Sequence, residues 1–527
     1  MENKQDKSKK VSLKPSFRIG MIVAGFLLPV FFLLLSSSIQ KPLDHDEHQF
    51  IAAGMLLAKH FSFPYLDYAY FHMPNLVFIN AALFTFTDHL LLSARLFSTL
   101  CTWLTLVIIF FSAFHLFRNY SSFIGFLFAI CSVVILLINP VFVYTVGKAW
   151  NHDLPILLTL VAFILFSEGI KRENKRRWFF ASGLMIGLAI GTRLTFAPVV
   201  LPFLIMFFLL PRRLGNKELV KQILTFVLGL FVGLLPSVVL FTLAPRQFMF
   251  GNFGYAAYNT LYRQQQGFTE GDLSSTTMSL SGKLSYLSQN ILFEPTIGLL
   301  LLAYLFFVFR NFFRRMRRPP FWSMVVLSSI LLPFLLLGSL APTPAWYQYF
   351  YAPIPFLVLA LLYGVAAFYE QNDRKNLTII LLVANIIGAS VFGAQFYPNV
   401  GILLRPAESL AVRVHDLGLK IASQVDGGRV LTLVPLFPLE GGVSIYEEFA
   451  TGSFGWRVAP LLPIEKRKEA GLVAATDLDH FLGNKFPAAI LTGYEDFLEQ
   501  PFTEFAEQSG FRSLKLTTDK TLWLANP

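Results

Sequence analysis

Long runs of apolar residues, separated by short polar segments, fill the first three quarters of this 527-residue chain. The runs are roughly 15 to 25 residues long, and a helix of that length crosses a hydrocarbon core of about 30 Å. A backbone in lipid must satisfy its own hydrogen bonds, so the pattern predicts transmembrane helices. We expect eleven spans, near residues 18–39, 90–117, 121–140, 154–169, 178–192, 195–211, 222–243, 290–309, 321–340, 351–369 and 376–395.

Residues 75–88 form one further apolar stretch, but its thirteen or so residues are short for a span. A full crossing there would also invert the sidedness of every later segment. We therefore expect a helix that lies at the outer surface or dips into the membrane.

The composition agrees with a membrane protein, because 55% of the residues are hydrophobic and only 14% are charged. The formal net charge is +11, and the basic residues gather in short segments such as 171–177, 211–217 and 310–318. This distribution is the positive-inside pattern, not a groove for nucleic acid. It predicts a cytoplasmic N-terminus (1–17) and, after eleven crossings, a C-terminus outside, with the bacterial plasma membrane as the expected location.

The predicted fold class is an α-helical polytopic membrane protein with a small α/β domain outside the membrane. The membrane domain covers residues 18–395 and carries outer loops at 40–89 and 244–289. Residues 396–527 differ in composition, because they alternate strand-like runs such as RVLTLVPL (429–436) with amphipathic stretches. That alternation is typical of an α/β domain.

The first outer loop holds the densest group of ionisable residues. Four acidic residues and four histidines follow the first predicted span within about thirty residues. Water lies close to such a loop, so a solvated loop without chemistry is the alternative to a functional one.

The order of residues in this loop favours function. Asp46 and Glu47 precede a small-residue helix, and Asp67, His72 and Pro74 follow in the pattern PYxDYxxxHxP. This loop resembles that of the C-type membrane glycosyltransferases, which include dolichyl-phosphate-mannose protein mannosyltransferases and aminoarabinose transferases of lipid A. The resemblance implies that the Asp-Glu pair faces the acceptor and that the later motif contributes to the substrate site.

Other segments extend the resemblance over nearly all of the first 395 residues. GKAWNHDLP (147–155) places Asp153 where related enzymes have a second acidic residue. Residues 183–205 are similar to their Gly-rich helix, basic residue and Pro-containing helix, and 345–364 to their late aromatic segment. The resemblance implies an enzyme that moves a sugar from a polyprenyl-phosphate-linked donor to an extracytoplasmic acceptor.

An inverting displacement at the anomeric carbon needs a carboxylate to take the acceptor proton and cations to hold the leaving phosphate. The resemblance assigns the base to Asp46, and only the motif favours it over Asp44. Glu47 would orient the acceptor or tune the Asp46 pKa, and Asp153 joins them as a catalytic candidate.

Basic residues on the outer side are the candidates for the phosphate. Arg193 lies at the turn between two predicted spans, Lys148 precedes the fourth, and Arg246 and Arg263 lie in the large outer loop. A guanidinium grips phosphate bidentately, so Arg193 and Arg263 rank above Lys148. The alternative for Arg193 is a snorkelling arginine at the membrane surface.

Aromatic and histidine residues add further candidates. Tyr347 and Tyr349 belong to an aromatic cluster that forms either an interfacial belt or a surface for the sugar or lipid phosphate. His72 and His152 are candidate ligands for a divalent metal, although their spacing is no metal signature. No cofactor is assigned from the sequence.

Two other classes of function compete with a glycosyltransferase. A multi-pass transporter or flippase would show repeated halves or ionisable groups near the midplane, whereas the acidic residues here gather in outer loops. A non-catalytic scaffold with a binding domain would leave the first loop unexplained. The acceptor stays open among a protein hydroxyl, lipid A, a polysaccharide and a cell-wall glycan.

Overall fold

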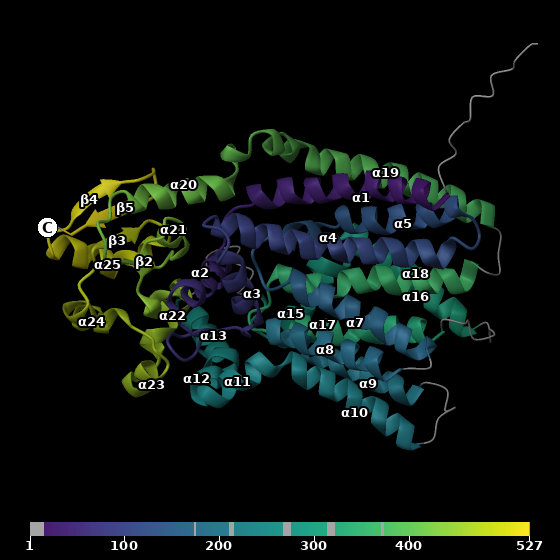
Figure 1. Ribbon diagram of the computed structural model, residues 1–527, viewed down its shortest axis with the longest axis horizontal. Helices are drawn as coiled ribbons and strands as arrows, with labels where there is room; N and C mark the ends of the chain where they lie inside the picture. Colours follow the sequence, from purple (N-terminus) through teal and green to yellow (C-terminus); the bar gives the residue numbers. More distant parts are fainter. Residues whose placement is uncertain are drawn as a thin grey trace, which may run out of the picture.

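The computed structural model shows long helices running side by side, with a smaller unit that contains a sheet beyond one end of them (Figure 1). We call residues 406–525 the α/β unit. The structure describes residues 15–172, 175–209, 216–266, 276–313, 322–369 and 374–525. Most of the predicted cytoplasmic N-terminus, parts of the three basic segments and residues 267–275 of the large outer loop lie outside these ranges.

Each predicted span corresponds to a helix or to a broken helix. The helices are α1 (Pro15–Gln40), α4 (Leu90–Phe117), α5 (Ser122–Leu137), α7 (Asp153–Lys171), α8 (Arg176–Thr192), η1 (Leu194–Val199) with α9 (Val200–Leu209), α10 (Asn216–Gly233) with α11 (Leu235–Leu243), η3 (Leu287–Leu292) with α16 (Pro295–Phe313), α17 (Trp322–Leu340), α18 (Pro353–Tyr369) and α19 (Arg374–Val400).

Length and composition support fewer spans than eleven. Among the described residues, six helices are long and apolar enough to cross a membrane, or up to eight if each bent pair is one span. One bent pair is α10 with α11, whose axes meet at 58°. The other is the helical segment Leu280–Leu292 with Pro295–Arg310, whose axes meet at 93°. Three predicted spans do not meet the criterion for a membrane-spanning helix. α5 and the η1–α9 segment are apolar but too short, and α8 is 17 residues long and starts with two arginines.

The short apolar stretch forms α3 (Asn75–Phe84), a helix of ten residues. At 1.5 Å per residue it is about 15 Å long, half of what a span requires. It packs on α2 (His45–His60) so closely that a Cβ at Gly54 would be 2.4 Å from the Asn80 Cβ. The first outer loop is therefore a compact helical layer at the end of the bundle.

Glycines bring α8 and α10 into direct backbone contact. A Cβ at Gly183 would be 2.0 Å from the carbonyl oxygen of Phe226, and a Cβ at Gly229 would be 2.0 Å from that of Phe180. Small residues on both helices let their backbones approach, which is a common basis of helix association in lipid.

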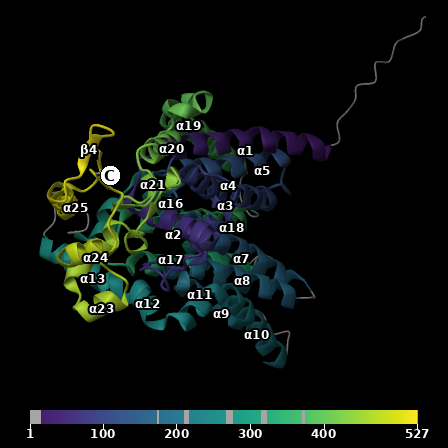
Figure 2. The ribbon, with the colours of Figure 1, turned by 60° about the vertical axis from the view of Figure 1, so that its left-hand side comes forward.

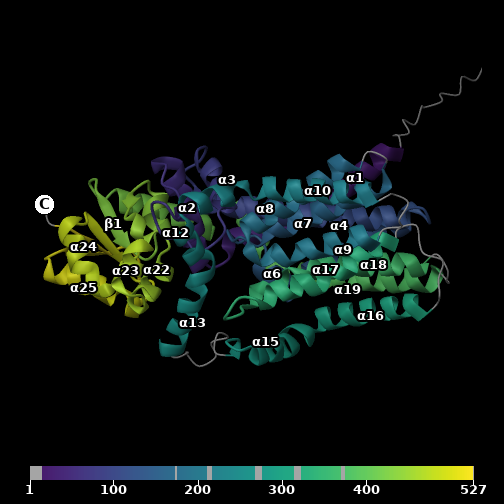
Figure 3. The same ribbon diagram turned by 90° about the horizontal axis from the view of Figure 1, so that it is seen from below.

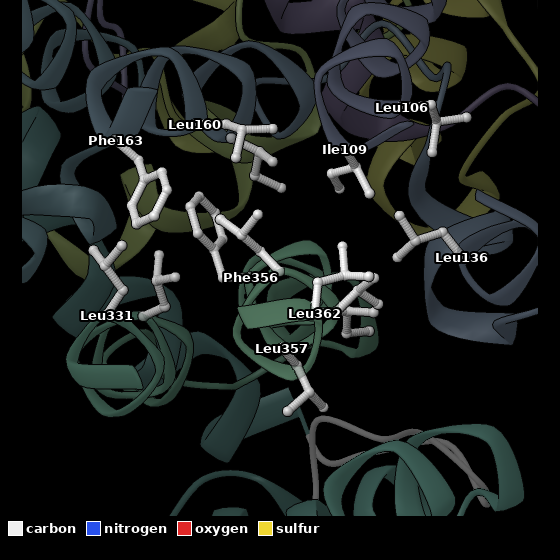
Figure 4. Close-up of a cluster of buried hydrophobic side chains, with 14 of the residues drawn as sticks. Leu106, Ile109, Leu136, Leu160, Phe163, Leu331, Phe356, Leu357 and Leu362 are labelled. Carbon is white, nitrogen blue, oxygen red and sulfur yellow. The ribbon is translucent and has the colours of Figure 1, made fainter. Parts of the chain in front are cut away.

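The apolar core of the bundle surrounds α18 (Figure 4). Side chains from four neighbouring helices meet it there. They include Leu106 and Ile109 of α4, Leu136 of α5, Leu160 and Phe163 of α7, and Leu331 of α17, which pack with Phe356, Leu357 and Leu362 of α18. This packing fixes α7 and α18 relative to each other, so the segments at their starts are also held together.

The α/β unit contains a five-stranded mixed sheet in the order β2-β1-β3-β5-β4. β1 pairs in parallel with β2 and β3, whereas β5 is antiparallel to β3 and β4. β1 falls within the predicted strand-like run at 429–436. The strands are β1 (Arg429–Thr432), β2 (Ser444–Ile445), β3 (Ala489–Thr492), β4 (Arg512–Lys515) and β5 (Thr521–Leu524). The helices around them include α20 (Leu410–Ala422), α21 (Leu436–Glu440), α22 (Ser453–Val458), α23 (Ile464–Glu469), α24 (Leu478–Asn484) and α25 (Asp496–Gln508).

A buried carboxylate joins the α/β unit to the bundle. Glu440, which is 2% exposed, accepts hydrogen bonds from the Leu90 and Leu91 amides at 3.1 and 2.7 Å. These amides belong to the first turn of α4, where a negative charge is favourable. His415 Nδ1 lies 2.9 Å from the same carboxylate. The unit is thus held against the helix ends by specific polar contacts.

Helices of the outer loops fill the space between the α/β unit and the bundle. Figures 2 and 3 show α2 and α12 (Pro245–Met249) in this position, and Figure 3 shows α13 (Tyr255–Gln266) there and α15 (Leu280–Tyr286) continuing toward α16. The predicted site residues in the first loop therefore lie at an internal boundary of the molecule.

Candidate active site

Five predicted residues lie at the ends of elements that point toward the α/β unit. Asp46 is in the first turn of α2, Lys148 precedes α7, and Asp153 is the first residue of α7. Arg193 ends α8, and Tyr349 belongs to η4 (Tyr347–Tyr351), directly before α18. The fold thus gathers residues that are up to about 300 positions apart in the sequence at one end of the bundle.

The start of α2 fixes the position of Asp46. Asp44 is the N-cap, and its side chain accepts a hydrogen bond from the Asp46 amide at 3.1 Å. The Glu47 side chain accepts from the Asp44 amide at 3.2 Å, which completes a capping box. Asp46 Oδ1 then accepts from Gln49 Nε2 at 2.9 Å. The carboxylate is held in one orientation at a helix N-terminus.

The Asp46 carboxyl has an unusually high pKa. Burial raises it most, and the neighbouring charge of Asp44 raises it further, to about 7. The guanidinium groups of Arg193 and Arg457 and the Gln49 hydrogen bond act in the opposite direction. A carboxylate with a pKa near the working pH can take a proton from a hydroxyl and release it again.

Gln49 also connects Asp46 to His72. Its Nε2 lies 3.1 Å from His72 Nε2, and an amide NH₂ donates, so the ring nitrogen accepts. Burial and the charge of Arg193 lower the His72 pKa to about 3, which keeps the ring neutral. The Oε1 of Gln49 and the Tyr70 hydroxyl are buried without a hydrogen-bond partner among the described residues.

The structure places Glu47 in a buried ion pair. Its two oxygens accept from Arg95 Nε at 2.8 Å and Nη2 at 2.6 Å, and both side chains are fully buried. The Ala149 amide donates a further bond at 2.8 Å. Although burial opposes ionisation, Arg95 holds the Glu47 pKa below its usual value. Glu47 ties the first loop to α4.

Arg95 is a residue that the sequence analysis missed. Its Nη1 also donates to the carbonyl oxygens of Ser38 and Lys41, at 2.9 and 2.8 Å. It therefore holds the end of α1 as well as Glu47. An arginine in an otherwise apolar span is expensive unless it is paired, and that signal could have indicated its role.

Asp153 is likewise enclosed by protein groups. It is 2% exposed, and its oxygens accept from the Gly147 amide at 2.9 Å and the Tyr351 hydroxyl at 3.1 Å. Gly147 has φ +75°, and a Cβ there would be 2.9 Å from Ser38 Cβ, so the turn requires glycine. Through these bonds Asp153 positions the Gly147 turn and η4.

Arg193 has the geometry of an anion-binding residue. Its Nη1 lies 3.1 Å from His152 Nε2 and bonds Asn151 Oδ1 at 2.5 Å, and its Nε donates to Thr195 Oγ1 at 3.1 Å. The guanidinium lies 4.8 Å above the Tyr349 ring. None of these contacts neutralises the charge, and together they fix the plane of the guanidinium.

Residues of α17 and η4 take part in two spaces, a polar pocket around Arg193 and an apolar groove. The pocket is lined by His152, Arg193, Thr195, Leu335, Gly338, Ser339, Tyr349 and Ala352, among others. The groove lies between α16, α17 and α18, and apolar residues line it: Leu287, Ile291, Leu292, Ile297, Leu301, Leu332, Pro333, Leu336, Phe350, Pro353, Ile354 and Leu357. Both spaces are lined in part by residues of α17 and η4.

Lys148 directly follows Gly147 and contacts the N-cap residue of α2, Asp44. Its Nζ is 3.6 Å from Asp44 Oδ2 and 4.1 Å from the centre of the Trp150 ring. This pairing partly offsets the charge of Asp44, which in turn acts on Asp46.

Other predicted residues occupy different surroundings. Asp67 is exposed, and its carboxylate closes a turn by accepting from the Phe63 amide at 2.6 Å, so it is not placed at the site. Arg246 pairs with Glu469 at 2.8 Å on the surface. Two further residues contact aromatic rings: Tyr347 lies 5.4 Å from Tyr144, and Arg263 lies 5.7 Å from the Trp346 ring.

The two candidate histidine ligands do not fit a metal. Nε2 of His72 accepts from Gln49, and Nε2 of His152 accepts from Arg193, so each ring offers that nitrogen to a protein donor. In the described part of the chain, no group of three or more His, Cys, Asp or Glu residues could hold a metal ion.

Arg457 of α22 is a second residue that the sequence analysis missed. Its charge acts on Asp46 from the α/β unit, and its Nη2 donates to the Tyr255 hydroxyl of α13 at 3.1 Å. It lies more than 400 residues from Asp46 in a segment without a recognisable motif. No local signal in the sequence could have placed it at the site.

Comparisons with known proteins find a family and a fold that this chain resembles. Residues 72–241 match a family model described as dolichyl-phosphate-mannose-protein mannosyltransferase. The fold is similar to that of ArnT from Cupriavidus metallidurans bound to undecaprenyl phosphate, with a TM-score of 0.58 and 15% identity over 98% of this chain and 100% of ArnT. The apo form of ArnT gives 0.59 and 13% identity over 97% and 100%.

A weaker likeness, with a TM-score of 0.47 and 12% identity, links 89% of this chain to 69% of an oligosaccharyltransferase from Archaeoglobus fulgidus. No curated protein matches the sequence. The family match over residues 72–241 and the ArnT-like fold together confirm that this chain resembles the C-type membrane glycosyltransferase superfamily.

Proposed function

We propose that this protein is a glycosyltransferase that moves a sugar from a polyprenyl-phosphate-linked donor to an acceptor outside the membrane. One observation carries the proposal. A carboxylate with a pKa of about 7, Asp46, lies in the field of a rigidly held guanidinium, Arg193, whose pocket shares α17 and η4 with an apolar groove. The undecaprenyl phosphate bound to ArnT supports the same class of donor here.

The groove and the arginine fit the two parts of such a donor. An isoprenoid chain would lie between α16, α17 and α18, in contact with apolar side chains alone. The phosphate would reach Arg193, whose guanidinium can bond two of its oxygens. The unpartnered groups of Gln49 and Tyr70 beside Asp46 are available to sugar or acceptor hydroxyls.

The reaction that these residues support is a single inverting displacement. The acceptor oxygen attacks the anomeric carbon and forms the new glycosidic bond, while its proton passes to Asp46. The bond between the anomeric carbon and the phosphate oxygen breaks, and its electron pair leaves with the polyprenyl phosphate. Arg193 stabilises the charge that develops on this phosphate.

We also propose the orientation that follows from the charge pattern. α7 starts at the site and runs 19 residues, about 27 Å, to the basic segment that begins at Lys171. Basic residues at the end remote from the α/β unit favour a cytoplasmic location for that end. Eleven crossings, with α3 outside, would then place residues 396–527 on the outer surface of the plasma membrane.

The test compares Asp46→Asn with Asp88→Asn, an equivalent change at an exposed position of the same outer loop. Each full-length protein would be reconstituted in liposomes with a panel of undecaprenyl-phosphate sugars and an envelope extract, and released undecaprenyl phosphate would be measured. We expect Asp46→Asn to lose roughly 10² to 10⁴-fold in rate, as when a general base is removed. Full activity in Asp46→Asn would move the base to another residue.

A further inference from the structure

Arg457 of the α/β unit lies against the first outer loop. Its helix, α22, packs next to Phe71, because a Cβ at Gly455 would be 3.8 Å from the end of that ring. Phe71 in turn stacks on Tyr255 of α13, with ring centres 4.0 Å apart. Three segments from distant parts of the sequence therefore meet at Arg457, which is 8% exposed.

The surroundings of Arg457 are mostly aromatic. Its guanidinium lies 4.6 Å from the Phe454 ring, and its Nη2 donates to the Tyr255 hydroxyl. The Phe454 ring lies 6.4 Å from that of His45, the residue before Asp46. Arg457 is therefore held beside the start of α2 by aromatic contacts and one neutral hydrogen bond.

The charge of Arg457 is not matched by a direct ion pair. The charged and titratable groups that act on it or share its surroundings are Tyr255, Tyr262, Asp46, Glu495, His45 and Arg263. In the described part of the chain, no carboxylate oxygen lies within 4.0 Å of its nitrogens. Its Nε is buried and has no hydrogen-bond partner there. A buried cationic donor of this kind is costly to leave unsatisfied, unless a ligand completes it.

We infer that Arg457 and Tyr255 form a second anion-binding site, on the α/β side of Asp46, for a phosphate or carboxylate group of the acceptor. This inference rests on the proposed function. The pocket of Arg193 shares α17 and η4 with the apolar groove, so Arg193 would serve the donor phosphate, whereas Arg457 comes from the α/β unit. An acceptor held there would place its hydroxyl between the two arginines, next to Asp46.

The site can be tested by phosphate binding to the full-length protein in lipid nanodiscs. Inorganic phosphate would be titrated at constant ionic strength, with and without saturating undecaprenyl phosphate, and binding followed by calorimetry. We expect phosphate to bind the protein that already holds undecaprenyl phosphate. Loss of phosphate binding once undecaprenyl phosphate is present would show a single anion site and overturn the inference.

Variants assign the binding to Arg457. Arg457→Gln should weaken phosphate binding roughly ten- to hundredfold, because a charge-assisted hydrogen bond is lost, while binding of undecaprenyl phosphate stays within about twofold. Arg457→Lys should retain part of the affinity, and Tyr255→Phe should lose a few-fold. Arg413→Gln, at an exposed position of α20, should bind as the wild type does.

The outcomes separate this inference from the proposed function. Unchanged phosphate affinity in Arg457→Gln would overturn the second anion site, even if undecaprenyl phosphate binds well. Absence of undecaprenyl phosphate binding in the wild type would instead contradict the proposed donor. Were Arg457→Gln to unfold, the Tyr255→Phe variant would decide, since it removes one hydroxyl from the same site.

Discussion

Replacement of Asp44 by asparagine should move the acid limb of the pH–rate profile to lower pH. A general base works only when ionised, so activity should fall as the pH drops through the Asp46 pKa of about 7. About one eleventh of the carboxylate is ionised at pH 6 and about ten elevenths at pH 8, so the wild-type rate should rise roughly tenfold between them. An aspartate with an ordinary pKa would give a flat profile there.

Asp44 is the second cause of this high pKa, after burial. A like charge a few ångströms away in a partly solvated site costs about 1 to 2 kcal/mol, or roughly one pKa unit, and Lys148 at 3.6 Å from Asp44 limits the effect. Asparagine is as good an N-cap as aspartate, so α2 should keep its start. The limb should move to about pH 6, and the rate at pH 6 should rise about fivefold.

The measurement is the initial rate of undecaprenyl phosphate release between pH 5 and 9, at saturating donor, for wild type and Asp44→Asn. Asp88→Asn serves as the control, because it removes a carboxylate of the same loop at an exposed position. The reasoning would be refuted by a flat wild-type profile between pH 6 and 8, or by a limb that moves to higher pH in Asp44→Asn.

Three further predictions concern stability. Glu440→Ala leaves two amides of α4 without acceptors and should lower the free energy of unfolding by about 2 kcal/mol; an unchanged melting temperature would contradict the docking role. Glu47→Gln leaves the buried Arg95 charge uncompensated and should lower the free energy of unfolding by about 3 to 5 kcal/mol. The loss should appear in size-exclusion chromatography as loss of the monodisperse peak after mild heating, whereas a stable variant would argue against the ion pair. Gly183→Val should separate α8 from α10 and cause aggregation in detergent. The control is Gly393→Val, because a Cβ at Gly393 meets no atom within 4 Å and should not cause aggregation. Equal aggregation of the two variants would exclude close packing of α8 and α10 as the cause.

Much of the helical architecture could be predicted because lipid leaves the backbone few choices. The span predicted at 90–117 and the helix α4 have the same bounds, since an apolar run bounded by polar residues has little ambiguity. The breaks were harder to predict. The bend between α10 and α11 follows a Gly and precedes Pro236, but such residues also occur within unbroken helices, as Pro333 does in α17.

The candidate site could be predicted only where its residues are local. Asp46 follows from the order of residues in the first loop, and Arg193 from a basic residue between two apolar runs. The ion pair between Glu47 and Arg95 joins positions 48 apart, and Arg457 reaches Asp46 from another unit. Such partners depend on tertiary packing, which periodicity along one segment does not encode.

The three predicted catalytic carboxylates differ most in what surrounds them. Glu47 has a guanidinium bonded to both of its oxygens, so it stays ionised and cannot usefully take a proton. Asp153 is closed off by a backbone amide and a tyrosine hydroxyl. Asp46 is partly buried beside another carboxylate, and two guanidinium groups act on it without forming a direct ion pair with it in the described structure. Its negative charge is therefore neither fully stabilised nor prevented from forming, so the Asp46 pKa lies near neutral pH, as a general base requires.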